Sequence, residues 1–348
     1  MEGILNTAAA GKRCRADTSV QDGAMTDAAA LAKGHPATLP AGKARYLALL
    51  VPILGLGELG AHLYFARRAP STDEWTAIRP LVASWYKPAS AVVIAPHWAE
   101  PMARLAFGDE LMPLRDVARP DVSRYGEAVE VSILGRRASE LGGWKVVREE
   151  RKGKFTLRAL ANPAPPQITF DFTDHIDPRV ADVRIERKGG AIDCTFNSNA
   201  AVESGGLGGA PTFPAARFAC VGEPSHVFVG VTIIDDEKAR PRRCIWSHPP
   251  GNDAELVTRF HAVPLGTQIH GHAGAGWLIE RDRAVPPFNV KVLVAGQEVG
   301  NVVHEPGDFW KPFEFVLPAS TAQRTADVEF RVGASGGGTH VCFEADSR

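Results

Sequence analysis

The sequence predicts a mainly β protein with an N-terminal single membrane helix, a small α/β segment and two β-rich units, the last a jelly-roll-like β-sandwich. Three observations predict this class. One apolar stretch, residues 46–66, is long enough to cross a bilayer. From about residue 128, apolar residues recur with the period of two that is typical of strands. The 34 glycines and 26 prolines punctuate short apolar runs and indicate frequent turns.

Residues 1–44 are rich in Ala, Gly, Thr and Asp and show no sustained apolar periodicity. Such a composition cannot bury enough apolar surface to fold, so we expect a disordered tail. Met25 is an alternative start, because an ordinary-looking tail also begins there. Basic residues before the apolar stretch favour a cytoplasmic tail: Lys12, Arg13, Arg15, Lys33, Lys43 and Arg45.

The stretch YLALLVPILGLGELGAHLYFA, residues 46–66, has the length of a membrane helix. About 20 residues at 1.5 Å rise match a hydrocarbon core of roughly 30 Å. A G-x-G-x-x-G pattern that begins at Gly55 offers a nucleotide-binding alternative. Against it, Pro80 stands where the fingerprint requires an acid, and Pro52 interrupts the required strand. We therefore predict a single span, with the membrane as a partner.

Glu58 and His62 are the two ionisable residues within this stretch, and four residues apart they share a helical face. Two explanations remain open. Either both side chains reach the membrane interface, or they face a partner helix, for which Gly57 and Ala61 form a small-xxx-small pair. The second explanation predicts a membrane-complex subunit that acts through Glu58.

Charge and cysteine patterns indicate the partners and the compartment. The net charge is −1, and no basic patch is interleaved with aromatic residues, so we expect no nucleic-acid partner. Cys14 is alone in the tail, whereas four cysteines follow the span and allow three pairings. We favour Cys194–Cys220 with Cys244–Cys342, because the second bond would tie the first and last strands of the C-terminal unit; four reduced cysteines are the alternative. The bulk of the chain is then extracytoplasmic, in the periplasm or at the cell surface.

Residues 71–125 carry the one α/β pattern. Ser71 or Thr72 can cap a helix that has two acids in its first turn, and apolar residues follow at helical spacing. AVVIA at 91–95 then indicates a buried strand, and HWAEPMARLAF at 97–107 indicates a second helix. A strand between two helices predicts a small α/β segment.

Two β-rich units follow. Residues 128–238 contain alternating runs separated by turn clusters, together with a Gly-rich loop at 203–214. Residues 240–348 contain about nine short runs with turns every 8 to 12 residues, which favours a sandwich or jelly roll. One of these expected strands is GWLIERD, at 276–282.

Two segments resemble known families. Residues 71–115, with DEWTAIRPLVASWYKPASAVVIAPHW, resemble the extracytoplasmic part that follows the last span of multi-spanning glycosyltransferases that use lipid-linked sugars. The segment lacks the spans and catalytic loops of those enzymes, so the resemblance does not imply their activity. Residues 240–348, with WKPFEFVLP and CFEAD, are similar to jelly-roll modules of envelope and carbohydrate-active proteins. Both resemblances imply a cell-envelope or surface-glycan setting.

His270-Gly-His272 is the first candidate site. Residues two apart on a strand project to one face, so both imidazoles could reach one divalent metal. Glu280 and His304 follow, and cupins, which are jelly rolls, bind metals with a similar set. Here seven residues separate His272 from Glu280, and Pro and Gly follow His304 instead of preceding it. The alternative is a set of hydrogen-bonded histidines without a metal.

An aromatic surface is the second candidate site. Trp310 has Asp308 and Lys311 beside it, and Trp277 lies in the same unit, so these residues could bind a sugar through exposed rings and nearby polar groups. Burial of both rings in the core is the alternative. A third candidate is a general acid–base set whose geometry the sequence leaves open: His97, Glu100, Asp109, Asp116, Asp121 and Arg124.

The sequence thus favours a non-enzymatic, membrane-anchored extracytoplasmic protein. Its β domains would bind a glycan or an envelope protein in cell-envelope or surface-polysaccharide processes, and it would need no cofactor. The alternative is a metal-dependent enzyme whose divalent ion is bound by His270, His272 and His304.

Overall fold

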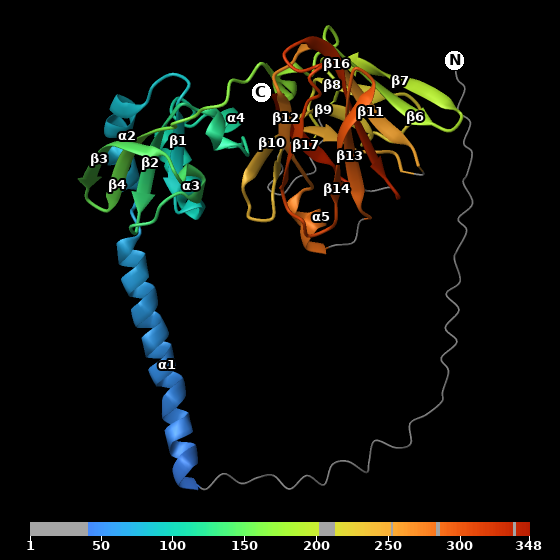
Figure 1. The fold of residues 1–348 in the computed structure, drawn as a ribbon. Coiled ribbons are helices and arrows are strands. Elements are labelled where there is room, and N and C mark those ends of the chain that lie inside the picture. The colour runs from blue at the N-terminus through green and yellow to red at the C-terminus, as the bar shows by residue number, and fades with distance from the viewer. Residues whose placement is uncertain (1–40, 202–212, 252, 283–285, 337–338) are drawn as a thin grey trace, which may run out of the picture. The chain divides into compact units, whose positions relative to one another are not determined.

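The computed structural model describes residues 41–201, 213–251, 253–282, 286–336 and 339–348 (Figure 1). Most of the predicted tail, with Cys14 and Met25, and most of the predicted loop at 203–214 lie outside these residues. The chain divides into two compact units, residues 1–64 and residues 65–348.

Helix α1 (Ala41–Arg68) confirms a helix over residues 46–66. Among the described residues, however, no helix has both the length and the apolar character that crossing a bilayer demands. The predicted membrane span is therefore not supported.

The second unit begins with a four-stranded sheet in the order β1-β2-β4-β3. Strands β1 and β2 are parallel, and the other pairs are antiparallel. Trp75 anchors the core of this layer, with ring centroids 5.7 Å from Phe107 and 4.7 Å from Phe155. The strands are β1 (Ala91–Ala95), β2 (Glu127–Ile133), β3 (Lys145–Lys152) and β4 (Phe155–Ala161).

The helices of this layer follow the predicted pattern. Ser71 and Glu74 form a complete capping box at the start of α2, which satisfies two backbone N–H groups. The predicted second helix is a 3₁₀ turn that continues into α3. The helices are α2 (Thr72–Trp85), η1 (His97–Ala99), α3 (Glu100–Phe107), α4 (Leu114–Val117), η2 (Val122–Arg124) and η3 (Ser139–Leu141).

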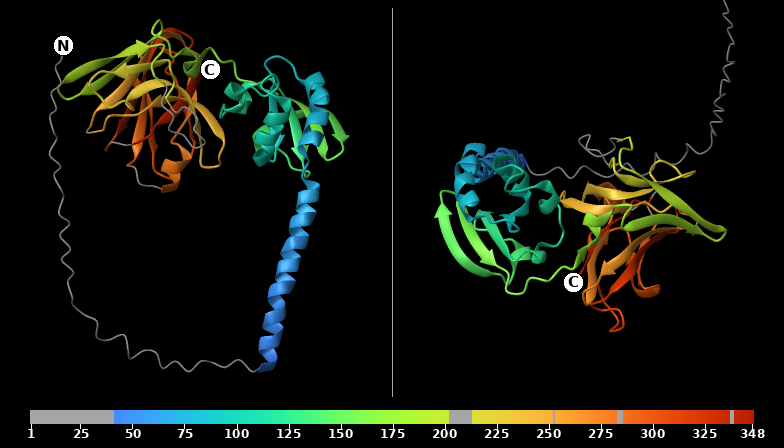
Figure 2. Two further views of the ribbon diagram at one scale, coloured as in Figure 1. Left: turned by 180° about the vertical axis from the view of Figure 1, so that it is seen from behind. Right: turned by 90° about the horizontal axis from the view of Figure 1, so that it is seen from above.

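The rest of the unit is a two-layered β-sandwich, which can be followed from two further sides in Figure 2. One layer has the order β14-β13-β16-β11-β6, and the other has the order β8-β9-β10-β17-β12-β15. Strand β7 pairs with β6 and with β8, so it joins the layers, and β5 pairs with β17. A continuous apolar core lies between them and includes Phe172, Phe260, Phe330 and Phe343.

The sandwich elements have the following bounds: β5 (Phe170–Asp171), η4 (Phe172–His175), β6 (Ala181–Arg187), β7 (Gly190–Asn197), β8 (Arg217–Cys220), β9 (Phe228–Asp235), β10 (Pro241–Ser247), β11 (Glu255–Pro264), β12 (Gln268–Gly274), α5 (Trp277–Asp282), β13 (Phe288–Val294), β14 (Gln297–His304), β15 (Lys311–Val316), β16 (Thr325–Ala334) and β17 (Cys342–Ser347).

Two details differ from the sequence pattern. The strand expected at 276–282 is the helix α5, because an apolar run of this length does not distinguish a strand from a buried helix turn. The sheets also do not divide near residues 128 and 240. Strands β2 to β4 belong to the sheet of β1, and β6 to β10 belong to the sandwich. A uniform period of two identifies strands but does not show which strands pair, so the sequence pattern does not reveal this boundary.

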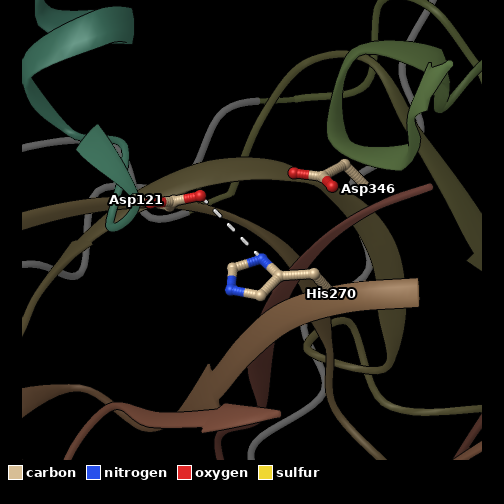
Figure 3. A group of neighbouring side chains, drawn as sticks. All are labelled: Asp121, His270 and Asp346. Atoms are coloured by element: carbon tan, nitrogen blue, oxygen red, sulfur yellow. Dashed lines mark ion pairs between the residues drawn. The ribbon is translucent and has the colours of Figure 1, made fainter. Parts of the chain in front are cut away.

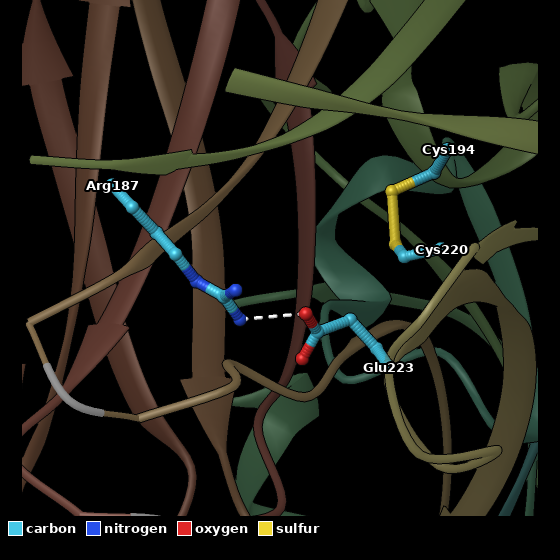
Figure 4. Close-up of a disulfide and its surroundings, with 4 residues drawn as sticks. All are labelled: Arg187, Cys194, Cys220 and Glu223. Atoms are coloured by element: carbon cyan, nitrogen blue, oxygen red, sulfur yellow. Dashed lines mark hydrogen bonds and ion pairs between the residues drawn. A yellow bond between two sulfur atoms is a disulfide. The ribbon is translucent and has the colours of Figure 1, made fainter. Parts of the chain in front are cut away.

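Both expected disulfides are present. Cys194–Cys220 joins the paired strands β7 and β8, and Figure 4 shows it near the ion pair of Arg187 and Glu223, which are 2.7 Å apart. The Cys244–Cys342 bond joins β10 to β17, where Trp246 is the register partner of Cys342. The preferred pairing is therefore confirmed.

Polar contacts join the small sheet and the sandwich along one seam. The backbone N–H of Arg243 donates to the carbonyl of Ala118 over 2.8 Å. The guanidinium of Arg119 lies 2.6 Å from a carboxylate oxygen of Asp171. These contacts, made in part by largely buried charges, place the helices that follow β1 beside the hairpin between β9 and β10.

Candidate functional site: a groove along the seam

Three adjoining cavities follow this seam, with volumes of about 130, 280 and 630 Å³. The first and second share His97, Glu140 and Arg240, and the first and third share Glu100. Trp98 lines the second cavity. We call the space that these five residues line the seam groove.

Three groove residues come directly after β1. The chain turns there into η1 and α3, which carry His97, Trp98 and Glu100. Ala99 and Ala103 are buried and pack α3 and η1 into the core of the small sheet. Glu100 stands in the first turn of α3, where the helix dipole favours a negative charge.

Arg240 is held by the hairpin between β9 and β10. Asp236 is fully buried there, and its Oδ1 accepts the backbone N–H groups of Lys238 at 2.8 Å and Arg240 at 2.9 Å. Its Oδ2 accepts a hydrogen bond from Arg242 Nε at 2.8 Å. One carboxylate therefore fixes the turn and the backbone from which Arg240 extends.

Burial sets the ionisation of the groove. It lowers the pKa of His97 to about 4, and the nearby charge of Arg240 adds to this effect, so the imidazole is neutral at pH 7. Burial raises the pKa of Glu100, although Arg104, 3.8 Å away, opposes the shift. Burial and then Asp116 raise the pKa of Tyr125 to about 12. The groove therefore offers neutral donors and acceptors beside charged ones.

Of the three guanidinium groups that line the first cavity, two are already paired and one is not. Arg119 pairs with Asp171, and Arg242 pairs with Asp236. Within the part of the chain that the structure describes, the guanidinium of Arg240 has no carboxylate partner, and its buried Nε has no hydrogen-bond partner. A buried donor without a partner is costly, so a ligand or a water molecule that accepts a hydrogen bond from Nε would be favoured here.

Trp98 is the aromatic member of the groove, and 63% of its surface is exposed. The exposed ring leaves apolar faces available for contact with a ligand. A flat apolar ring, a free guanidinium and two carboxylates together fit a ligand that has apolar faces and several hydroxyl groups.

The predicted histidine pair lies elsewhere, on β12. The rings of His270 and His272 are 5.4 Å apart, as expected for residues on one face of a strand. His272 Nδ1 lies 2.7 Å from Glu344 Oε1. His270 lies near Asp121 and Asp346, and Figure 3 shows the three side chains turned toward one another, with 3.9 Å between His270 Nδ1 and Asp121 Oδ2.

Among the described residues, Asp121, His270 and Asp346 are the group whose potential metal-ligating atoms all lie within 4.8 Å. Arg348 already pairs with both acids, at 2.7 Å to Asp121 and 2.6 Å to Asp346. Hydrogen bonds from Ser123 and Arg348 outweigh burial and lower the pKa of Asp121. A metal ion here would stand beside a guanidinium that already pairs with both acids, so these residues fit a metal poorly.

His304, the third predicted ligand, belongs to a different contact set. It is almost fully buried, with Nε2 2.9 Å from Glu280 Oε1 and 2.9 Å from the carbonyl of Phe309. Its ring stacks on Phe288 with the centroids 4.4 Å apart. Glu280 also accepts the backbone N–H of Gly307 at 2.8 Å. His304 and Glu280 thus anchor a turn.

The predicted aromatic surface is half-buried. Trp310 packs against the cluster that contains the Cys244–Cys342 disulfide, and the guanidinium of Arg242 lies 5.9 Å from the centre of its ring. Asp308 pairs with Lys311 at 2.8 Å. Trp277 lies under Arg281, whose guanidinium is 4.6 Å from the ring centre. Because Arg242 also lines the seam groove, Trp310 adjoins it through this one residue.

The third predicted set is brought together in part. His97, Glu100 and Asp116 line one cavity, whereas Asp109 is exposed and does not line it. Arg124 pairs with Asp171 at 2.8 Å. Sequence reasoning missed Trp98 and Arg240. The position of Trp98 directly after a buried strand was a signal in the sequence. Arg240 had no such signal, because only the folded hairpin brings it to the groove.

No family model matches the chain, and no curated protein matches it. Solved structures similar to part of it include a carbohydrate-binding module of family 51 from Clostridium perfringens in complex with methyl-galactose, at 11% identity and a TM-score of 0.24, covering 34% of this chain and 81% of that one. Another holds a second such module, in complex with GlcNAc, and INT domains from Clostridium perfringens ZmpB, at 11% identity and a TM-score of 0.28, covering 59% and 40%.

A third is a family 61 carbohydrate-binding module in complex with β-1,4-galactotriose, at 15% identity and a TM-score of 0.17, covering 36% of this chain and 70% of that one. These structural neighbours are carbohydrate-binding modules. Likenesses with TM-scores below 0.3 carry no information about the ligand of this chain.

Proposed function

We propose that this chain is a carbohydrate-binding protein of the cell envelope or cell surface, and that the glycan binds in the seam groove. The single observation that carries the proposal is that one cavity is lined both by the exposed Trp98 and by Arg240, whose buried Nε has no hydrogen-bond partner among the described residues. A sugar ring would cover the apolar face of Trp98. Its hydroxyl groups would accept from Arg240 and donate to Glu100 or Glu140.

The extracytoplasmic part of the proposal rests on the two disulfides. Disulfides persist in oxidising compartments and are rare in the cytosol, where thiols are kept reduced. The mixed charge of the groove gives the glycan class. Carboxylates and guanidinium groups stand together, so a neutral or weakly acidic sugar fits better than a polyanion.

The test is a glycan-array screen of the full-length chain, followed by calorimetric titration of the best ligand. Trp98→Ala should weaken binding at least tenfold, which corresponds to about 1.4 kcal/mol, because the variant loses the stacking surface. Arg240→Gln should have an effect of similar size. Leu105→Ala is the matched control, since Leu105 is 74% exposed on α3 and does not line the groove.

Two outcomes would overturn the proposal. Absence of binding to any glycan would remove the function. Glycan binding that survives both Trp98→Ala and Arg240→Gln but is lost on Trp310→Ala or Trp277→Ala would move the site to the surface of the sandwich.

A further inference from the structure

Three histidines from adjacent strands meet on the outer face of the sandwich, apart from the seam groove. His248 follows β10, His340 precedes β17, and His226 precedes β9. The ring centroids of His226 and His248 are 4.5 Å apart, and those of His248 and His340 are 5.3 Å apart. We call them the histidine triad.

The strand register explains why they meet. Trp246 pairs with Cys342 across β10 and β17, so two residues further along His248 stands opposite His340. The backbone bond from Ser247 N–H to Val341 O, at 2.9 Å, continues this ladder. Because side chains alternate along a strand, Cys244, Trp246 and His248 share one face. The triad thus lies at one end of a patch that the second disulfide anchors.

One ring nitrogen of the central member of the triad is unsatisfied. His248 is only 2% exposed, and its buried Nδ1 has no hydrogen-bond partner among the residues that the structure describes. A buried ring nitrogen left unsatisfied costs free energy unless a ligand meets it. His226 and His340 are half-buried.

The chemistry of the triad selects one ligand class. From the structure we infer that His226, His248 and His340 bind one late first-row divalent metal ion, with Zn²⁺ as the natural occupant and Cu²⁺ as an equally suitable probe. Neutral imidazoles suit zinc and copper, whereas calcium and magnesium prefer oxygen ligands. Three histidines with a fourth position open to solvent is an established arrangement for zinc.

The spacing fits this inference. With a metal–nitrogen distance of about 2.0 Å, two imidazoles at a tetrahedral angle have ring centres about 5 Å apart. The two measured separations lie on either side of that value. The ring nitrogens of the triad do not all lie within 4.8 Å of one another, so binding requires the rings to turn about their Cβ–Cγ bonds. The rings of His226 and His340 are half-buried, whereas His248 is 2% exposed, so the turn falls to the two outer members.

The test uses tag-free, full-length protein stripped with a chelator. Titration calorimetry with Zn²⁺ should give one equivalent of binding, and His226→Gln and His340→Gln should each weaken it at least tenfold. These two histidines are half-buried, so their replacement spares the core. His261→Gln is the matched control, because His261 is 45% exposed and already paired with Asp182 at 2.7 Å.

A second readout locates the ion independently. The ring of Trp246 lies 5.0 Å from that of His340, so bound Cu²⁺ should quench its fluorescence. Trp246→Phe should remove most of the quenching and leave Zn²⁺ binding within a few-fold of the parent. The inference is overturned if no Zn²⁺ binds, or if binding survives both histidine changes. It is also overturned if His270→Gln or His272→Gln abolishes binding instead.

Discussion

At the residue scale, the ionisation of His97 in the groove makes the stability of the protein depend on pH. Its imidazole is held neutral because burial, and then Arg240, disfavour the charged form and lower its pKa to about 4. The ordinary value is 6.5, so on acidification the unfolded chain takes up a proton before the folded chain does. Stability therefore falls as the pH drops from 6.5 toward 4, and this contribution is constant below that window.

This predicts a measurable difference for one variant. Between pH 7 and pH 5 the histidine should cost the parent protein about 2 kcal/mol of unfolding free energy, at about 1.4 kcal/mol for each pH unit below 6.5. His97→Asn should lack that portion of the loss. Urea unfolding at both pH values, in the presence of a chelator, measures the difference. Equal losses in the parent and the variant would contradict the pKa of His97.

The charged residues of the seam show why a cluster of ligand types need not be a metal site. Asp121, His270 and Asp346 come together from η2, β12 and β17, as a metal site would require. Arg348 supplies the positive charge there, and the pKa of Asp346 is nevertheless raised by burial. Composition could not reveal this, because the counter-charge of Arg348 comes from 227 residues away from Asp121 in the chain.

At the scale of elements, the two disulfides act on different strand pairs. Cys194–Cys220 joins strands that are neighbours in sequence, across a separation of 26 residues. The Cys244–Cys342 bond joins β10 to β17 across a separation of 98 residues. A cross-link that closes a longer loop removes more entropy from the unfolded chain.

The loop lengths predict an order of stability. On the chain-entropy estimate, Cys194→Ser with Cys220→Ser should cost about 3.5 kcal/mol, and Cys244→Ser with Cys342→Ser should cost about 4.7 kcal/mol. Guanidinium unfolding of the two double variants, with thiol titration to verify the remaining bond, measures both. A larger loss from the first pair would show that native packing outweighs loop entropy.

At the scale of the whole molecule, buried ion pairs hold the small sheet against the sandwich. Asp171 accepts hydrogen bonds from Arg119 at 2.6 Å and from Arg124 at 2.8 Å, and all three side chains are largely buried. Asp174 adds a bond from Arg119 at 2.7 Å. Removing one partner from such a network leaves a desolvated charge, which is costlier than losing an exposed pair.

The network predicts that neutralising a buried acid costs more stability than neutralising an exposed one. Asp171→Asn keeps the oxygen that accepts the N–H groups of Thr173 and Asp174 but removes the charge. The variant should therefore lose about 3 kcal/mol of unfolding free energy. In calorimetry, the small sheet and the sandwich should then unfold in separate transitions. Glu110→Gln is the control, since Glu110 pairs with Arg79 at the surface and should cost less than about 1 kcal/mol. A single transition at the parent temperature would show that the seam does not depend on this charge.

Local chemistry in the sequence was sufficient for much of the fold. Ser71 and its capping box, the buried run at 91–95 and the period-two strands depend on neighbours within a few residues, so pattern and propensity predict them. The cysteine pairing was also accessible, because one bond joins neighbouring runs and the other joins the ends of the C-terminal unit.

Long-range pairing was decided only by the tertiary structure. The parallel contact of β1 with β2, the transfer of β7 between layers and the helix α5 leave no distinct local pattern. The seam groove joins Trp98 to Arg240, and the histidine triad joins His226 to His340, across more than a hundred residues in each case. Their proximity follows from strand register and burial, which a one-dimensional pattern of residues does not encode.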